Sequence, residues 1–192
     1  MQEHGLLGIH VLWFERAEKG PGFKSSADWD HDVAATTTND LPTITGWWIG
    51  EDIVWLALED RPDNRPSGRT GSCVELAQTE RGEDRKLLWS AFQEAGVAAP
   101  DVSVPADISP QNAPVDEALA IYPLEGLLAL AEMPNLPGSI NEHPNWRRRL
   151  AVPVSELFDD DSFVDRLLAV DQARQKSART KAATTHNVSP TD

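Results

Sequence analysis

The stretch "AATTTNDLPTITGWW", residues 34–48, combines a β-branched run, one carboxylate, a proline and two adjacent tryptophans. The run before Asp40 has the composition of a strand, and the residues after Pro42 have the composition of a helix. A carboxylate directly after a strand and before a helix occupies the position at which barrel enzymes carry their catalytic side chains. Asp40 is therefore the first candidate for a functional residue.

Three stretches have the composition of buried strands. Residues 8–15, "GIHVLWFE", are almost continuously apolar, and residues 32–40 carry no charge in the run that follows Asp32. Such runs are typical of strands that are buried on both faces. Residues 118–122 form the third strand, because Pro123 would interrupt a single long helix at this point. Residues 124–131 are then a short helix or turn.

The first predicted helix follows Asp40. Residues 42–59 repeat apolar side chains at helical spacing, with Pro42 at a position that helices tolerate. Asp40 or Thr43 could cap this helix, and a cap is worth about 1 kcal/mol. Capping is thus the structural alternative to a catalytic role for Asp40.

Two further helices are predicted later in the chain. Residues 83–96 are amphipathic and end at Gly96, and residues 155–175 repeat apolar side chains after the candidate cap Ser155. Between them, residues 133–150 are too rich in Pro, Gly and Asn for regular structure, so side-chain contacts must order this segment. Irregular segments of this kind often carry binding residues.

The elements predict one α/β domain with a parallel sheet. Buried strands that alternate with helices indicate this class. Residues 1–176 form the domain, 61–72 and 97–117 are surface connections, and 177–192 are a polar, disordered tail. About three strands are predicted, whereas complete sheets have roughly five or six, so the chain is expected to be part of something larger.

Composition excludes several functional classes. The chain has 17 basic and 31 acidic residues, a net charge of −14, and a pI near 4.7, which disfavours nucleic acid as a partner. One cysteine, Cys73, cannot form an internal disulfide, and no targeting or transmembrane segment is recognised, so a cytoplasmic location without membrane binding is expected.

No metal site is predicted. The acidic clusters "DWDHD" at 28–32 and "FDDD" at 158–161 lack partner histidines at ligand spacing. The basic run at 147–149 is interpreted as a solvated face that forms ion pairs.

Three motifs together resemble one enzyme family. "LLGIHVLWFER", "TTTNDLPTITGWWIGEDI" and "NLPGSINEHPNWRRRL" follow the order and approximate spacing of the 4-alpha-glucanotransferases, also called amylomaltases, of glycoside hydrolase family 77. The motifs cover most of residues 5–150. The resemblance implies the C-terminal portion of a TIM (β/α)8 barrel that transfers α-1,4-glucan segments between maltodextrins with retaining chemistry.

The resemblance also implies a role for Asp40. Retaining chemistry uses a nucleophile and an acid/base, and in this family both lie before the strand at residues 8–15, so both are expected to be missing from this chain. Asp40 matches the family's third acid, which binds sugar hydroxyls and stabilises the oxocarbenium-like transition state. No cofactor is implied, since carboxylates carry out the transfer.

Four other residues are candidate substrate contacts by the same resemblance. Asn39 replaces the usual His and can donate and accept hydrogen bonds but cannot become charged. Asn135 matches a substrate contact, or orders its loop. Trp47 and Trp48 are weaker candidates, because their helical position favours packing against the barrel. Gly126 stands where many relatives carry an acid.

Three hypotheses about function remain open. The first is the C-terminal fragment of a 4-alpha-glucanotransferase, inactive when isolated, whose substrates are α-1,4-glucans and maltooligosaccharides. The second is a non-catalytic glucan-binding or complementing module that associates with a separate N-terminal half, because a partial barrel exposes strand edges. The third is an intact small enzyme that uses Glu15, Glu51 or Asp52, although their spacing does not favour it.

Overall fold

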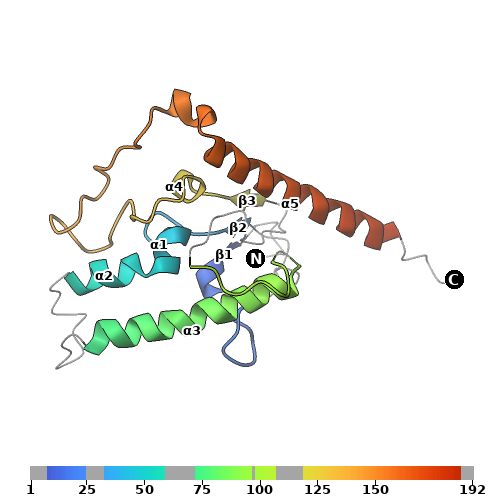
Figure 1. Ribbon diagram of the computed structural model, residues 1–192, viewed down its shortest axis with the longest axis horizontal. Helices are drawn as coiled ribbons and strands as arrows, with labels where there is room; N and C mark the ends of the chain where they lie inside the picture. Colours follow the sequence, from blue (N-terminus) through green and yellow to red (C-terminus); the bar gives the residue numbers. More distant parts are fainter. Residues whose placement is uncertain (1–7, 25–32, 59–71, 97, 107–118, 187–192) are drawn as a thin grey trace.

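A three-stranded parallel sheet lies at the centre of the protein (Figure 1). The structure, a computed structural model, describes residues 8–24, 33–58, 72–96, 98–106 and 119–186. The sheet order is β1 (Ile9–Val11), β2 (Val33–Ala35) and β3 (Leu119–Ile121), with both pairs parallel. The prediction of a parallel α/β sheet is confirmed.

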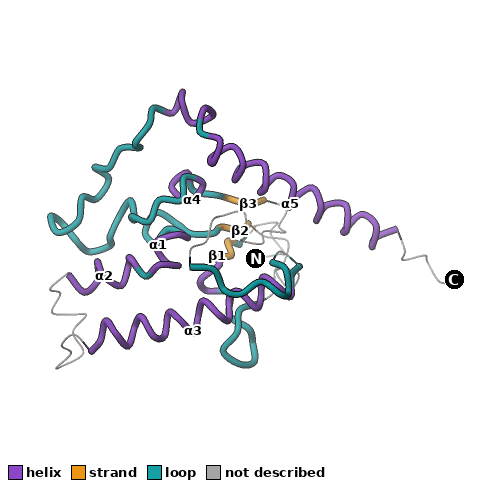
Figure 2. The backbone as a smooth tube through the Cα atoms, in the orientation of Figure 1, coloured by secondary structure: helices purple, strands orange, loops and turns teal. Residues whose placement is uncertain are grey.

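Helices connect and flank the strands (Figure 2). They are η2 (Leu12–Phe14), α1 (Ile44–Ile49), α2 (Glu51–Leu58), α3 (Ser72–Glu94), α4 (Leu124–Leu127), η6 (Val154–Asp159) and α5 (Asp161–His186), where η denotes a 3-10 helix. In Figure 1, α3 and α5 lie on opposite sides of the sheet.

The strands are shorter than predicted, and only the central strand is fully buried. All residues of β2 are buried, but Ile9 on β1 is 65% exposed and Ile121 on β3 is 48% exposed. The expectation of burial on both faces is therefore wrong for the two outer strands. Among the described residues, each outer strand has a hydrogen-bonded strand on one side only, so it receives less covering than the central strand.

The helix predicted for residues 42–59 is divided in two. Gly50 has a positive φ of 83° and ends α1, and its N–H donates to the carbonyl of Gly46. A residue with left-handed backbone dihedral angles commonly ends a helix, and glycine adopts that conformation at little cost. Thr43 is the cap of α1, because its Oγ1 accepts the Gly46 N–H at 3.0 Å. Asp40 does not cap this helix.

Helix α3 begins well before the predicted start at residue 83. In the described part of its first half, residues 73–82, no side chain is fully buried, and an ion pair ties this half to α2. Arg81 forms a two-fold pair with Asp52 of α2, with both distances 2.8 Å, and in the predicted second half Asp84 forms the same kind of pair with Arg16. Sequence periodicity detects apolar stripes, so it missed this half.

A cluster of aromatic side chains forms the core between α1 and α3. Trp13 stacks on Trp47 with ring centroids 4.4 Å apart, and Trp48 meets Trp89 edge to face at 6.3 Å. The indole N–H of Trp48 donates to the Pro105 carbonyl at 3.0 Å, which satisfies its one polar group.

The C-terminal helix also differs from its prediction. Residues 154–159 form η6, and Asp160 caps α5, since its Oδ1 accepts the Ser162 N–H at 2.9 Å. Ser155 is not the cap. Helix α5 continues to His186, past the predicted boundary at residue 176, because the residues there include several good helix formers.

Some predictions fall outside the described residues. The loop at 61–71, the acidic cluster at 28–32, most of the connection at 97–117 and the end of the tail at 187–192 are in this group. Within the described ranges, every helix is too short or too polar to span a lipid bilayer.

Tyr122, directly after β3, lowers the stability of the fold at alkaline pH. Burial raises the pKa of Tyr122 from 10.0 to about 12, against an opposing effect of Arg174 on α5. Tyr122 in the unfolded chain then ionises at lower pH than in the folded chain, so the contribution of Tyr122 to stability is constant below about pH 10 and falls between pH 10 and 12. The loss is at most about 1.4 kcal/mol per pH unit.

We expect Tyr122→Phe to remove this particular loss. Urea unfolding of the wild type and the variant at pH 8 and at pH 11 to 12 measures it, and the difference between the two proteins cancels the titration of other groups. An identical decline in both proteins above pH 10 would contradict the prediction.

Candidate functional site

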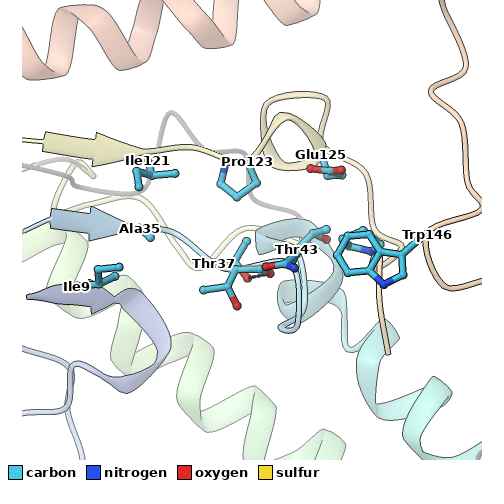
Figure 3. Close-up of a pocket in the computed structure, with 11 residues that line it drawn as sticks. Ile9, Ala35, Thr37, Thr43, Ile121, Pro123, Glu125 and Trp146 are labelled. Atoms are coloured by element: carbon cyan, nitrogen blue, oxygen red, sulfur yellow. Dashed lines mark hydrogen bonds between the residues drawn. The ribbon is translucent and has the colours of Figure 1, made fainter. Parts of the chain in front are cut away.

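A pocket lies where the strands end and their loops begin (Figure 3). Its volume is about 350 Å³, within the range of roughly 300–1,000 Å³ that is common for small-molecule sites. Apolar side chains from the three strands line one end, and Glu125 and Trp146 lie toward the other end. The lining residues are Ile9, Ala35, Thr37, Thr38, Asn39, Thr43, Ile121, Pro123, Glu125, Pro134 and Trp146.

The loop that carries Asn39 and Asp40 is fixed at both ends. Before it, the Thr37 hydroxyl donates to the Pro42 carbonyl at 2.5 Å. After it, the Thr43 hydroxyl lies 2.6 Å from the Leu130 carbonyl, which joins the loop to the segment after α4. Both threonines are buried, so the two exposed side chains between them are presented from a rigid support.

Asp40 and Asn135 lie in contact beside the pocket, although they are far apart in the sequence; neither lines it, but their neighbours Asn39 and Pro134 do. The Asn135 amide Nδ2 donates to Asp40 Oδ1 at 2.7 Å. This bond orients the carboxylate, and a carboxylate has about four acceptor sites, so others remain for ligand hydroxyls. The structure thus brings together two residues that the sequence proposed separately.

The other proposed contacts divide into two groups. Asn39 lines the pocket, beside Asp40. Trp47 and Trp48 are buried in the aromatic core, with Trp48 fully inaccessible and Arg81 stacked over Trp47 at 4.4 Å. In this structure neither indole has an open face for a sugar, and both have the packing role that was the alternative.

The segment 133–150 is ordered by side-chain hydrogen bonds, as predicted for its irregular sequence. Asn145 Oδ1 accepts the Leu136 N–H at 2.8 Å, and Asn145 Nδ2 donates to the Ser139 hydroxyl at 2.7 Å. His143 Nδ1 also lies 2.8 Å from Asn145 Oδ1. One half-buried amide therefore holds the loop that carries Asn135.

Among the lining residues that the sequence analysis did not propose are two with binding chemistry, Trp146 and Glu125. Trp146 stands within the motif "EHPNWRRRL", but nothing in its local pattern separates it from the core tryptophans. Glu125 directly precedes Gly126, the position at which the family resemblance implies an acid in many relatives. Trp146 and Glu125 are candidates because of their position at the pocket, and the spacing of residues in the sequence does not indicate that position.

Acids elsewhere have structural partners. Glu15 lies 2.8 Å from His10 Nδ1, and the buried Asp52 binds Arg81. Neither they nor Glu51 lines the pocket. Arg148 forms an ion pair with Glu132, in agreement with the interpretation of the basic run. No three His, Cys, Asp or Glu side chains in the described part of the chain are grouped to hold a metal ion.

Comparisons with known proteins give a consistent result. A sequence model of a family described as 4-alpha-glucanotransferase, glycoside hydrolase family 77, matches residues 1–155. A 4-alpha-glucanotransferase from Haemophilus influenzae is 22% identical over 186 residues, and one from Mycobacterium tuberculosis is 27% identical over 197 residues. These alignments cover 91% and 92% of this chain but 25% of each relative, so the chain spans about a quarter of their length.

A solved structure shares the fold. The amylomaltase from Corynebacterium glutamicum matches with a TM-score of 0.69 at 20% identity, over 90% of this chain and 26% of that protein. The predicted fold class, a portion of an α/β barrel with about three parallel strands, is confirmed by this match and by the sheet topology.

Proposed function

Because the chain belongs to the 4-alpha-glucanotransferase family, glycoside hydrolase family 77, we propose that it supplies the sugar-binding, transition-state-stabilising side of a glucan-transferring site. The substrates are α-1,4-glucans and maltooligosaccharides, and the reaction is a retaining double displacement. The hydrogen bond between Asp40 and Asn135, beside a pocket that their neighbours Asn39 and Pro134 line, is the observation that carries the proposal.

Asp40 acts through charge and hydrogen bonding. Its carboxylate accepts hydroxyls of the sugar at the cleavage point, and these bonds strengthen as positive charge develops at the anomeric carbon. Asn135 holds the carboxylate in position by donating to Oδ1. Asn39, one residue away at the pocket, can donate to or accept from the same ring.

The nucleophile and the acid/base come, in this proposal, from a segment other than these 192 residues. Retaining chemistry needs two carboxyl groups about 5–5.5 Å apart across the scissile bond. Among the described residues that line the pocket, Glu125 is the one acid. The greater length of the relatives also supports an external source for this pair.

A complementing module is the second candidate. The outer strands β1 and β3 carry the exposed side chains Ile9 and Ile121, both of which line the pocket. Open strand edges with apolar side chains favour pairing with further strands. The partner in this candidate is the remaining part of a glucanotransferase barrel, which would bring the missing carboxylates to the site.

A disproportionation assay on maltotriose tests the proposal. The purified chain is assayed alone and after mixing with the segment of the Mycobacterium tuberculosis relative that precedes the matched region. We expect glucose and longer glucans only from the mixture. Transfer by the chain alone would show that the nucleophile is in this chain, and no transfer in either sample would overturn the complementation.

A further inference from the structure

Trp146 is an exposed aromatic side chain at the pocket, unlike the tryptophans of the core. It is 62% exposed and lines the same pocket as Asn39 and Glu125. Figure 3 shows Trp146 and Glu125 toward the same end of the pocket, away from Ile9. A large exposed indole beside polar groups requires a reason, because burial of such a side chain is favourable.

The backbone of Trp146 is held in an unfavourable conformation. Its φ is +57°, in the left-handed region that bulky residues rarely adopt and that costs about 1–3 kcal/mol. The Trp146 N–H donates to the Pro134 carbonyl at 3.0 Å, which fixes this geometry next to Asn135. The indole is therefore presented from the same loop that orients Asp40.

A buried anchor beneath the loop supports this strained position. The neighbouring side chain of Asn145 holds the loop through the hydrogen bonds described above, and His143 is 1% exposed. The His143 ring packs edge to face on Trp55 of α2, with centroids 4.8 Å apart. The anchor fixes residues 143 and 145, so Trp146 cannot simply turn inward to bury its ring.

The chemistry of the pocket fits a pyranose ring. A flat apolar indole face suits the C–H face of a sugar, and the carboxylate of Glu125 and the amide of Asn39 suit its hydroxyls. We propose that Trp146 is a stacking platform for a glucose residue of an α-1,4-glucan, adjacent to the residue bound by Asp40. This inference rests on the proposed function and adds a specificity-determining residue to it.

A binding experiment on the full 192-residue chain tests the platform. Maltohexaose is titrated into the wild type, Trp146→Ala, Trp146→Phe, Asp40→Asn and Phe14→Ala by calorimetry and by tryptophan fluorescence. Phe14 is the matched control, since it is 66% exposed and does not line the pocket. We expect roughly a tenfold higher Kd for Trp146→Ala, a smaller rise for Trp146→Phe, and no change for Phe14→Ala.

Fluorescence separates binding from a structural role. The glucan-induced change in emission should be present in the wild type and Phe14→Ala and lost in Trp146→Phe, which keeps a flat ring at this position. If Trp146→Ala unfolds, Trp146→Phe still gives both readouts.

Three results would overturn the platform. Unchanged affinity in both Trp146 variants, with weaker binding by Asp40→Asn, would overturn the platform alone and leave the proposed function standing. An absence of maltohexaose binding by the wild type would overturn both. Unchanged glucan affinity together with weaker association with the barrel segment would place Trp146 in a protein interface.

Discussion

Asp40→Asn is expected to lower glucan transfer by the complemented enzyme by about 10²–10³-fold, the usual cost of losing one preorganised electrostatic group. The substitution keeps the shape of the side chain and removes its charge. Asp40 is exposed and its one described partner is the Asn135 amide, so the fold should not depend on the charge. The loss should fall mainly on kcat, because the interaction with the oxocarbenium-like sugar strengthens in the transition state.

Two variants make the interpretation of this loss specific. Asp84→Asn is the matched control, because it removes a carboxylate that pairs with Arg16 outside the pocket, and it should leave the rate unchanged. Asn135→Ala removes the amide that orients Asp40 and should give an intermediate loss. Maltotriose disproportionation by the three mixtures measures these effects, and an Asp40→Asn mixture as active as the wild type would reject the assigned role.

Gly46→Ala is expected to reduce the free energy of unfolding by roughly 3 kcal/mol or more. A Cβ at this position would lie 2.1 Å from the Ala131 carbonyl oxygen and 2.9 Å from Thr43 Oγ1. The Ala131 carbonyl is a backbone group and also lies 3.1 Å from the Thr43 hydroxyl, so it cannot move without breaking the contact that joins α1 to the segment after α4.

Gly82→Ala provides the matched control for Gly46→Ala. Gly82 lies inside α3, and a Cβ added there meets nothing within 4 Å. Alanine is the better helix former, so this substitution should stabilise the protein by about 1 kcal/mol. Urea unfolding monitored by circular dichroism compares the two, and equal midpoints for Gly46→Ala and the wild type would show that the close approach to Ala131 is absent.

The sequence predicted the sheet because its strands are runs of apolar residues. Val33, Ala34 and Ala35 are buried in the centre, and the third strand was located by the helix-breaking effect of Pro123. Burial of the outer strands was predicted wrongly, because a run such as "GIHVL" does not report how many neighbours its strand has. Strand order is a property of the whole sheet.

The errors in the helices have separate physical causes. Gly50 was included within a stripe of apolar residues, yet its left-handed conformation ends α1. The first half of α3 is tied to α2 by the ion pair of Arg81 with Asp52, which no local pattern displays. Charged pairs across elements become visible only when the fold has brought them together.

The candidate site was predicted in part. Asp40, Asn39 and Asn135 were proposed from motifs, and the structure places the first and third within hydrogen-bond distance and Asn39 at the pocket. Trp146 was missed because its exposure depends on a loop conformation with positive φ. Backbone conformation of this kind is set by the anchor at Asn145, and composition does not reveal it.

The sheet order has a consequence for how the protein folds. Val33 pairs with Ile9, close by in the chain, and with Leu119, which is several-fold further away in the sequence. The entropy lost on closing a loop grows with its length, and long-range pairing slows folding. The β1–β2 pair should therefore form first and β3 should join late, so the juxtaposition of Asp40 and Asn135 is completed only in the last stage of folding.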